Sequence, residues 1–304
     1  MDVSVCIPVF NSDVKKLVTA LAEQIALNQL SAEIVVLDDA SSIEMESQNR
    51  TALQELNHTR YFSLPKNVGR SAIRNRFIDY ATGDFLLFID GDSEIINPNF
   101  LENYTKTLSS SPIDLLYGGS VYSEDAPQAN YFLRWKYSWI RESKSAQERS
   151  ITPYGFKTNN FIIKKSVFSS FPFDERIQGY GHEDTLFGFI LCKNKIVLNH
   201  VENPVLNSCL DTNDIFLSKT EEAIKNLWYI HKNIATEMDF VENIRLLKAY
   251  YWLKNRGLLP LLKLSNYLLG KYNKRLLLSG RFTIRMFDFF KLSMLLKQAS
   301  TQDK

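Results

Sequence analysis

Cysteine is scarce in this sequence. Cys6, Cys192 and Cys209 are the only three among 304 residues, and no two of them have the close spacing of a metal-binding pair. An odd and sparse set of this kind excludes a disulfide framework and is typical of proteins from a reducing compartment. We therefore expect a cytoplasmic protein without structural disulfides.

Long apolar runs are also missing. No uninterrupted run approaches the ~20 residues that a membrane-spanning helix needs, and the chain contains no internal repeat or low-complexity tract. Met1 and Asp2 lead directly into an apolar segment without a basic stretch before it, so we expect no signal peptide. The apolar content of 45% is nonetheless sufficient for a hydrophobic core and excludes a disordered chain.

Acidic residues almost disappear near the C-terminal end. Between residues 244 and 297, twelve Lys and Arg accompany a single acid, Asp288. The rest of the chain, with 24 basic and 33 acidic residues, has a net charge of −9. Leucines and aromatic residues alternate with the basic ones, a pattern typical of amphipathic helices at a membrane surface. Helices that pack on the body with a solvated basic face explain the same pattern, so both interpretations stay open. No recognition motif accompanies the charge, and we expect no nucleic-acid partner.

Strands and helices alternate in the first half of the chain. Apolar segments at 3–9, 33–37, 60–64 and 84–89 predict strands, and helical patterns lie between them, the first expected to be capped by Asn11 or Ser12. This alternation predicts an α/β fold with a mostly parallel sheet covered on both faces. Acids rather than glycines follow two of the strands and no GxGxxG motif is present, which excludes a dinucleotide-binding fold.

The strand expected at 84–89 ends in Asp90-Gly91-Asp92. Ligands of open α/β sheets bind beyond the carboxyl ends of the strands, where these two carboxylates are expected. Because clustered carboxylates repel each other, a hard divalent cation that holds a phosphorylated substrate is a natural partner for them. A solvated Asp-Gly turn is the structural alternative.

A second group of acids precedes a helical pattern. Glu183 and Asp184 follow a glycine-rich segment, and such acids either stabilise a helix N-terminus or provide a general base. His200 ends a short predicted strand and is either structural or a metal ligand. The aromatic residues between 120 and 150 either form a satellite core or stack on a sugar ring.

Six motifs in order closely resemble the family 2 glycosyltransferases of the GT-A fold that are common in bacteria. They are Val3 to Asn11 (VSVCIPVFN), Asp38 to Ser41 (DDAS), Asn67-Val68-Gly69 with Arg74-Asn75, Asp90-Gly91-Asp92, Asn159-Asn160, and Gly181 to Asp184 (GHED). The resemblance covers about residues 3–230. It implies a Rossmann-like GT-A catalytic domain at 1–235, with a nucleotide-sugar half at 1–119 and an acceptor half at 120–235, followed by a basic amphipathic helical extension at 236–304.

The resemblance also implies roles for individual residues. Asp90 and Asp92 would form the DxD motif, with Asp92 as a ligand of Mn²⁺ or Mg²⁺ and Asp90 near the donor and the metal. Asp184 would be the catalytic base, and Glu183 would hold acceptor or donor hydroxyls. The residues expected to bind the nucleotide sugar are Pro8, Phe10, Asn11, Asp38, Asp39, Asn67, Gly69, Arg74, Asp90, Gly91 and Asn160.

The sequence departs from the family pattern at one expected metal ligand. Close relatives have a histidine shortly after a turn that resembles Asn203-Pro204-Val205, and here that place is taken by Asn207. His200 is the other candidate, seven residues earlier. An asparagine carbonyl binds a hard cation more weakly than imidazole binds Mn²⁺, so weaker metal binding is expected here.

The implied activity is inverting glycosyl transfer in one displacement, without a covalent nucleophile. The donor would be a nucleotide-diphosphate sugar, with a UDP-sugar as the first choice, and the transferred group a hexose or N-acetylhexosamine. The acceptor would be a glycan or lipid-linked hydroxyl in polysaccharide biosynthesis, reached at the inner membrane face if residues 244–297 bind lipid. Two alternatives stay open: a non-catalytic degenerate relative, suggested by Asn207, and a nucleotidyltransferase, which would need a glycine-rich basic loop where Asn11-Ser12-Asp13 stands.

Overall fold

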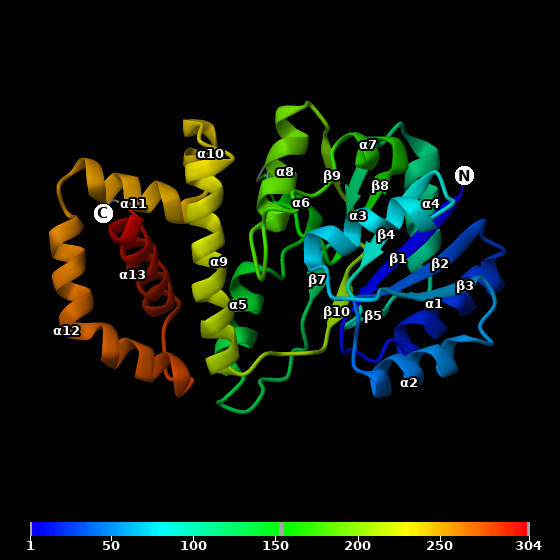
Figure 1. The fold of residues 1–304 in the computed structure, drawn as a ribbon, viewed down its shortest axis with the longest axis horizontal. Helices are drawn as coiled ribbons and strands as arrows, with labels where there is room; N and C mark the ends of the chain where they lie inside the picture. The colour runs from blue at the N-terminus through cyan, green and yellow to red at the C-terminus, as the bar shows by residue number, and fades with distance from the viewer. Residues whose placement is uncertain (1, 152–154, 303–304) are drawn as a thin grey trace. The chain divides into compact units, whose positions relative to one another are not determined.

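The computed structural model describes residues 2–151 and 155–302, and the chain divides into two compact units (Figure 1). The first unit comprises Met1–Ser123, Glu142–Gln178 and Glu183–Cys209. The second comprises Glu124–Arg141, Gly179–His182 and Leu210–Lys304. Each unit has its own arrangement of secondary structure and is described separately.

A seven-stranded sheet forms the centre of the first unit. Its strand order is β3-β2-β1-β4-β8-β6-β9, and β8 alone runs antiparallel to its neighbours in the pairings described. The predicted mostly parallel sheet is therefore confirmed. The strands are β1 (Val3–Val9), β2 (Ala32–Asp38), β3 (Thr59–Ser63), β4 (Phe85–Ile89), β6 (Leu115–Tyr117), β8 (Asn160–Lys164) and β9 (Leu198–His200).

Helices cover both faces of this sheet. Side chains of β1 alternate: Val5 and Ile7 join a core cluster on one face, whereas Cys6 joins the cluster on the other. The first face is covered by α1 (Lys15–Asn28), α2 (Ile43–Leu53) and α4 (Phe100–Ser110), and the second by α3 (Arg70–Tyr80), α7 (Lys165–Ser170) and α8 (Glu183–Lys193). Figure 1 shows α1 and α2 on the side of the sheet opposite α3.

A small three-stranded sheet lies beyond the end of β4. It has the order β5-β10-β7, from β5 (Ser93–Glu94), β10 (Val205–Asn207) and β7 (Ser120–Val121). Strands of two or three residues are too short to show periodicity, so the sequence did not predict them. The antiparallel pairing places Asn207 directly opposite Ser93, and therefore beside the end of the Asp90-Gly91-Asp92 segment.

The predicted capping of the first helix is wrong. The residue before α1 is Val14, and its N–H donates to Oδ1 of Asn49 at 3.2 Å. Asn11 instead has a left-handed backbone (φ 50°), and its Oδ1 accepts a hydrogen bond from the N–H of Ser42 at 2.8 Å. Asn11 therefore joins the ends of β1 and β2 rather than starting α1.

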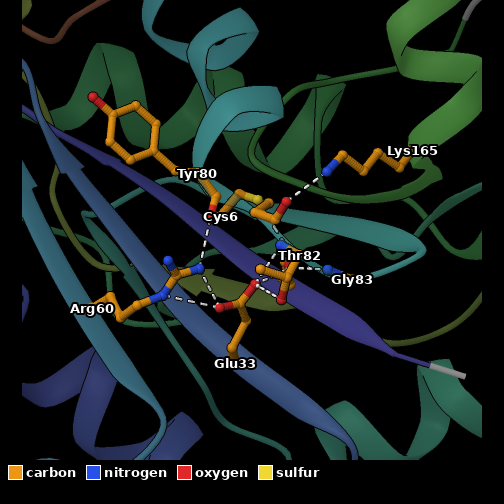
Figure 2. Close-up of polar contacts among 9 residues, drawn as sticks. Cys6, Glu33, Arg60, Tyr80, Thr82, Gly83 and Lys165 are labelled. Carbon is orange, nitrogen blue, oxygen red and sulfur yellow. Dashed lines mark hydrogen bonds and ion pairs between the residues drawn. The ribbon is translucent and has the colours of Figure 1, made fainter.

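A polar cluster around Glu33 holds the amino ends of the first strands together (Figure 2). The carboxylate of Glu33 accepts from Ser4 Oγ at 2.7 Å, from the N–H of Thr82 at 2.6 Å and from Arg60 Nε at 3.1 Å. Arg60 also donates to the carbonyl of Tyr80 at 2.6 Å. One side chain of β2 thereby fixes the turn that leads into β4, at the end of the sheet opposite the Asp90 segment.

The second unit is helical. It contains α5 (Phe132–Arg141), α9 (Asn213–Asn233), α10 (Met238–Asn243), α11 (Arg245–Asn255), α12 (Leu259–Leu278) and α13 (Ile284–Gln302). One cluster of its core consists of Leu133, Phe216, Leu217, Leu277, Phe282, Phe287 and Phe290. In the described part of the chain, no helix combines the length and apolar character required to cross a bilayer.

The division between the units differs from the boundary expected at residue 235. The helix α9 belongs with the C-terminal helices because Phe216 stacks on Phe287, with ring centroids 5.4 Å apart. Tyr137 of α5 contacts both rings, at 5.6 Å and 5.3 Å. Part of the aromatic segment at 120–150 thus contributes to a satellite core, as one of the two interpretations predicts.

Candidate functional site

The carboxyl ends of β1, β2 and β4 meet at one edge of the sheet. Val9 is paired with Asp38, and Cys6 with Phe88, so the residues that follow these strands lie close together. Phe10, just beyond β1, is 54% exposed. Gly91 packs against the end of β1, because a Cβ added to it would lie 3.3 Å from the carbonyl oxygen of Pro8.

Both carboxylates at the end of β2 organise neighbouring backbone. Asp38 is fully buried and accepts from the N–H of Ser41 at 2.7 Å and from the hydroxyl of Tyr61 at 2.5 Å. Asp39 is also buried, and it accepts from the N–H groups of Val68 at 2.7 Å and Gly69 at 3.0 Å. Burial raises the pKa of Asp39, although these two bonds oppose the shift.

The loop before α3 is thereby held against β2. Asn67 donates from Nδ2 to the carbonyl of Asp39 at 3.1 Å. Gly69 has φ 88°, and a Cβ built there would meet no atom within 4 Å. The left-handed backbone rather than crowding therefore favours glycine here, and the start of α3 faces open space.

Arg74 of α3 binds the DxD segment. Its guanidinium is buried and donates from Nη2 to Oδ1 of Asp90 at 2.6 Å and from Nη1 to the carbonyl of Arg70 at 3.0 Å. Its Nε atom is buried and has no hydrogen-bond partner within the described ranges 2–151 and 155–302. Asp90 is thus compensated by an arginine, and its side chain keeps 22% exposure.

Arg70, one turn earlier in α3, links two segments that are far apart in sequence. Its Nε donates to Oε1 of Glu183 at 2.7 Å, and its Nη2 lies 3.7 Å from Oδ2 of Asp90. The end of β4 and the start of α8 are therefore joined through one guanidinium. Sequence reasoning missed this residue, although an arginine one turn before Arg74 on the same helix face was a usable signal.

Glu183 and Asp184 have opposite electrostatic environments. Burial favours a raised pKa for Glu183, but the charges of Arg70 and Arg74 outweigh it and hold that pKa below its ordinary value. Burial and the charge of Glu183 raise the pKa of Asp184 to about 6, against the opposing charge of Lys157. Neighbouring carboxylates whose pKa values are separated in this way are typical of acid–base sites.

Lys157 belongs to a chain of polar contacts that reaches β10. Its ammonium forms an ion pair with the buried carboxylate of Glu142, which accepts from the hydroxyl of Tyr122 at 2.5 Å. That hydroxyl accepts from Nδ2 of Asn207 at 3.0 Å. This series of polar contacts leads from Lys157, whose charge acts on Asp184, to the strand β10. Lys157 and Glu142 were not predicted, because they lie in irregular segments, and Tyr122 was expected only as one of the aromatic residues between 120 and 150.

The two candidates for the second metal ligand lie in different places. Asn207 pairs with Ser93, the residue that follows Asp92. His200 ends the edge strand β9, and β8 and β6 lie between it and β4, a separation of about 14 Å at ordinary strand spacing. The structure therefore does not bring His200 together with Asp90 and Asp92. Burial and the charge of Arg149 lower its pKa to about 4, so it is neutral near pH 7.

The side chains near the end of β4 provide oxygen ligands for a divalent cation. No group of three or more His, Cys, Asp or Glu arranged to hold a metal occurs among the residues that the structure describes. Asp92 is exposed and carries a carboxylate. With its amide nitrogen bound to Tyr122, Asn207 retains a carbonyl oxygen. Mg²⁺ and Mn²⁺ accept such oxygen ligands and complete their shell with substrate phosphates, so the residues fit a substrate-dependent ion.

Asn160, which was expected to contact the donor, makes its hydrogen bonds within the protein. It is fully buried, and its Oδ1 accepts from the hydroxyl of Tyr104 at 2.6 Å. Its Nδ2 donates to the carbonyls of Gly119 and Asn203, both at 2.8 Å. Every polar atom of the amide is satisfied within the protein, so Asn160 joins β8 to the loop after β6.

Comparison with known proteins gives a family match over most of the first unit. Residues 4–171 match the model for glycosyl transferase family 2, more than half of the 304 residues. An uncharacterized glycosyltransferase of Methanocaldococcus jannaschii is 21% identical over 229 residues, 72% of this chain and 74% of the relative. The amylovoran biosynthesis glycosyltransferase AmsB of Erwinia amylovora is 30% identical over 189 residues, 57% of this chain and 58% of the relative.

Solved structures share the fold at low sequence identity. The mannosyltransferase PcManGT from Pyrobaculum calidifontis, in complex with GDP-Man and Mn²⁺, has a TM-score of 0.65 at 15% identity, over 99% of this chain and 86% of that one. Residues 1–349 of S. aureus TarS have a TM-score of 0.53 at 17% identity, over 100% of this chain and 92% of that one. These similarities confirm the GT-A fold, and the family match shows that the chain belongs to glycosyl transferase family 2, a family of glycosyltransferases.

Proposed function

We propose that this glycosyltransferase moves a sugar from a nucleotide-diphosphate sugar to an acceptor hydroxyl, with inversion of the anomeric centre. The observation that carries the proposal is the bridge formed by Arg70 between Asp90 and Glu183. It holds the DxD strand end, where a donor would bind, near a carboxylate pair with separated pKa values. Donor and base would therefore share one site in the first unit.

The donor would bind along the ends of β1, β2 and β4. Phe10 exposes its ring to a nucleotide base, and Gly69 leaves open space at the start of α3. Asp38 and Asp39 would act mainly by holding the loops that line this space, because both are buried and already accept backbone hydrogen bonds. Arg70 provides the positive charge that a diphosphate requires, with a side chain that is 41% exposed.

A divalent cation would be held by Asp92 and the carbonyl oxygen of Asn207 together with donor phosphates. When bound, it supplies Lewis-acid neutralisation of the leaving diphosphate. The Mn²⁺ in the complex of the Pyrobaculum mannosyltransferase supports this class of cofactor. Since this chain contributes only one charged ligand and one amide, we expect weak metal binding until the donor is present.

Asp184 would act as the general base. Its carboxylate takes the proton from the acceptor hydroxyl as that oxygen bonds to the anomeric carbon and the bond from this carbon to the diphosphate breaks. A base needs to be ionised at working pH and still basic, and a pKa of about 6 meets both requirements near pH 7. One displacement inverts the centre and needs no covalent nucleophile.

The names of similar proteins suggest the substrate class. A complex of TarS with UDP has a TM-score of 0.52 to this chain, and AmsB is named for amylovoran biosynthesis. We therefore propose a UDP-sugar with a hexosyl or N-acetylhexosaminyl group, and a glycan or lipid-linked acceptor in polysaccharide biosynthesis. The family match leaves no support for the nucleotidyltransferase alternative.

The experiment that tests this proposal is a panel of UDP- and GDP-sugars with and without Mn²⁺. Calorimetry measures donor binding, and nucleotide release measures slow hydrolysis of the donor without an acceptor. We expect one donor class to bind and to release nucleotide. Binding without release in any condition, including added glycan acceptors, would instead favour the non-catalytic alternative.

A further inference from the structure

We propose that the outer face of α12 binds the surface of an anionic lipid bilayer. This docking face is defined by Leu261, Leu264, Leu268, Lys271, Tyr272 and Arg275, which recur at helical spacing on one side of the helix. It is independent of the donor and base chemistry proposed above, and it is confined to the second unit.

The apolar members of the docking face are unusually exposed. Leu261 is 59% exposed, Leu264 53%, Leu268 66% and Tyr272 63%. Globular proteins rarely leave neighbouring large apolar side chains in water, except where another surface covers them. The docking face is therefore a candidate interaction surface rather than an ordinary solvated helix face.

The opposite side of α12 is well anchored, so the exposure does not come from a loosely placed helix. Leu262, Asn273 and Leu277 are buried, and Leu277 belongs to the core of the second unit. Asn273 donates from Nδ2 to the carbonyl of Met286 at 3.0 Å. The helix is thus fixed in rotation, and its docking face is presented outward.

The positive charge of the docking face indicates which kind of partner it binds. No Asp or Glu occurs between residues 243 and 287, whereas Lys271 and Arg275 lie among the exposed leucines. Neither of them has an acidic ion-pair partner within residues 2–151 and 155–302. A bilayer with anionic headgroups offers phosphates to the cations and acyl chains to the leucines at the same depth. An acidic protein surface would satisfy only the cations.

The two other basic helices, α11 and α13, support different interpretations of the basic segment 244–297, membrane binding and packing respectively. In α13, Phe287, Phe290 and Leu295 are buried, so this helix serves packing. In α11, Trp252 is 51% exposed beside a shallow hollow of ≈ 480 Å³ that is also lined by Arg245 and Lys248. The combination of cations and an exposed aromatic ring is therefore repeated in α11, which suits the headgroup region of a bilayer.

The test is co-sedimentation of the full chain with phosphatidylcholine vesicles, with and without phosphatidylglycerol, in the absence of donor. Lys271→Gln/Arg275→Gln should lower binding to anionic vesicles roughly 25-fold, about fivefold for each charge, while Lys15→Gln/Lys195→Gln in the first unit should not. Leu264→Ser/Leu268→Ser should lower it at least ~10-fold. Its control is Leu27→Ser/Val197→Ser, at positions that are 82% and 68% exposed in the first unit.

Binding of both α12 variants at the wild-type level would overturn the proposal. So would a wild-type dimer that Leu264→Ser/Leu268→Ser converts to a monomer in sedimentation without vesicles, because a second copy would then cover the docking face. Circular dichroism of each variant confirms that the helices persist, as expected for substitutions at exposed positions.

Discussion

Arg70 Nε lies 2.7 Å from Oε1 of Glu183, and Arg70 Nη2 lies 3.7 Å from Oδ2 of Asp90. These carboxylates are 93 positions apart in the sequence, and each carries out its proposed role only if its segment is held in place. A single guanidinium with five donors in a planar fork is suited to this bridging. The bridge also stabilises the ionised form of Glu183, which in turn favours protonation of Asp184.

Removal of the bridge should therefore impair turnover. Arg70→Gln removes the charge beside Glu183, and we expect nucleotide release from the donor to fall about 100-fold, since bonds to charged groups contribute roughly 1.5–3 kcal/mol. Arg76→Gln, at an exposed position of the same helix, is the matched control and should retain activity. Equal activity of the two variants would show that the bridge is not required.

The pH dependence of turnover should report the environment of Asp184. Because the base must be ionised, kcat/KM should fall with acid through a pKa near 6. The charge of Lys157 opposes the rise of this pKa, so Lys157→Gln should move the acid limb to higher pH. Lys164→Gln, at an exposed position, should leave the profile in place. A profile in Lys157→Gln that is unchanged or shifted to lower pH would contradict the assignment.

Metal binding should distinguish Asn207 from His200. Asn207→His places an imidazole beside Asp92 and should tighten Mn²⁺ binding in the presence of UDP roughly tenfold. Asp92→Ala should remove most of that binding, whereas His200→Asn should change it little, because two strands separate β9 from β4. Electron paramagnetic resonance of free Mn²⁺ measures each affinity without any turnover. Loss of binding in His200→Asn alone would reverse the two assignments.

The cluster around Glu33 should contribute to stability in a pH-dependent way. Burial opposes ionisation of Glu33, but hydrogen bonds from Ser4, Thr82 and Arg60 outweigh it and lower its pKa below 4.5. A lowered pKa in the folded state stabilises the protein above the unfolded-state pKa, and this contribution is lost as the pH falls through the folded-state value.

Urea unfolding tests this expectation. Glu33→Gln should lower the free energy of unfolding by about 1–3 kcal/mol near pH 7, with the share from the partly exposed Arg60 reduced by solvent. The difference from wild type should shrink as the pH falls below about 4.5. Glu55→Gln, at an exposed position, is the control. A difference that grows toward acid pH would contradict the sign of the linkage.

The sequence predicted the sheet better than the site. Predominantly apolar runs identified β1 and β4, because strands buried on both faces need them. The three short strands of the small sheet have too few residues for any periodicity. Motifs located Asp90 and Asp184 but could not show that Asn160 is enclosed by Tyr104 and Asn203, since burial of a polar residue depends on tertiary contacts.

Residues in irregular segments were missed for the same reason. Lys157, Glu142 and Tyr122 come together only in the folded chain, and no local pattern connects positions 15 and 20 residues apart. The expected boundary at 235 and the observed division differ in the placement of α9. The apolar face of α9 is compatible with either neighbour until its contact with Phe287 is known.

The central claim is that Asp184 is the base of a glycosyl transfer reaction, and Asp184→Asn tests it most directly. The amide keeps the shape of the side chain but cannot accept the acceptor's proton, so turnover should fall by ~10²–10⁴ with little change in calorimetric donor binding. Glu183→Gln should be milder if Glu183 only positions hydroxyls. Asp114→Asn, at a position of the same unit where the side chain is 47% exposed, should be fully active. Near wild-type turnover by Asp184→Asn would contradict the account and leave Glu183 and Asp184 as a helix start.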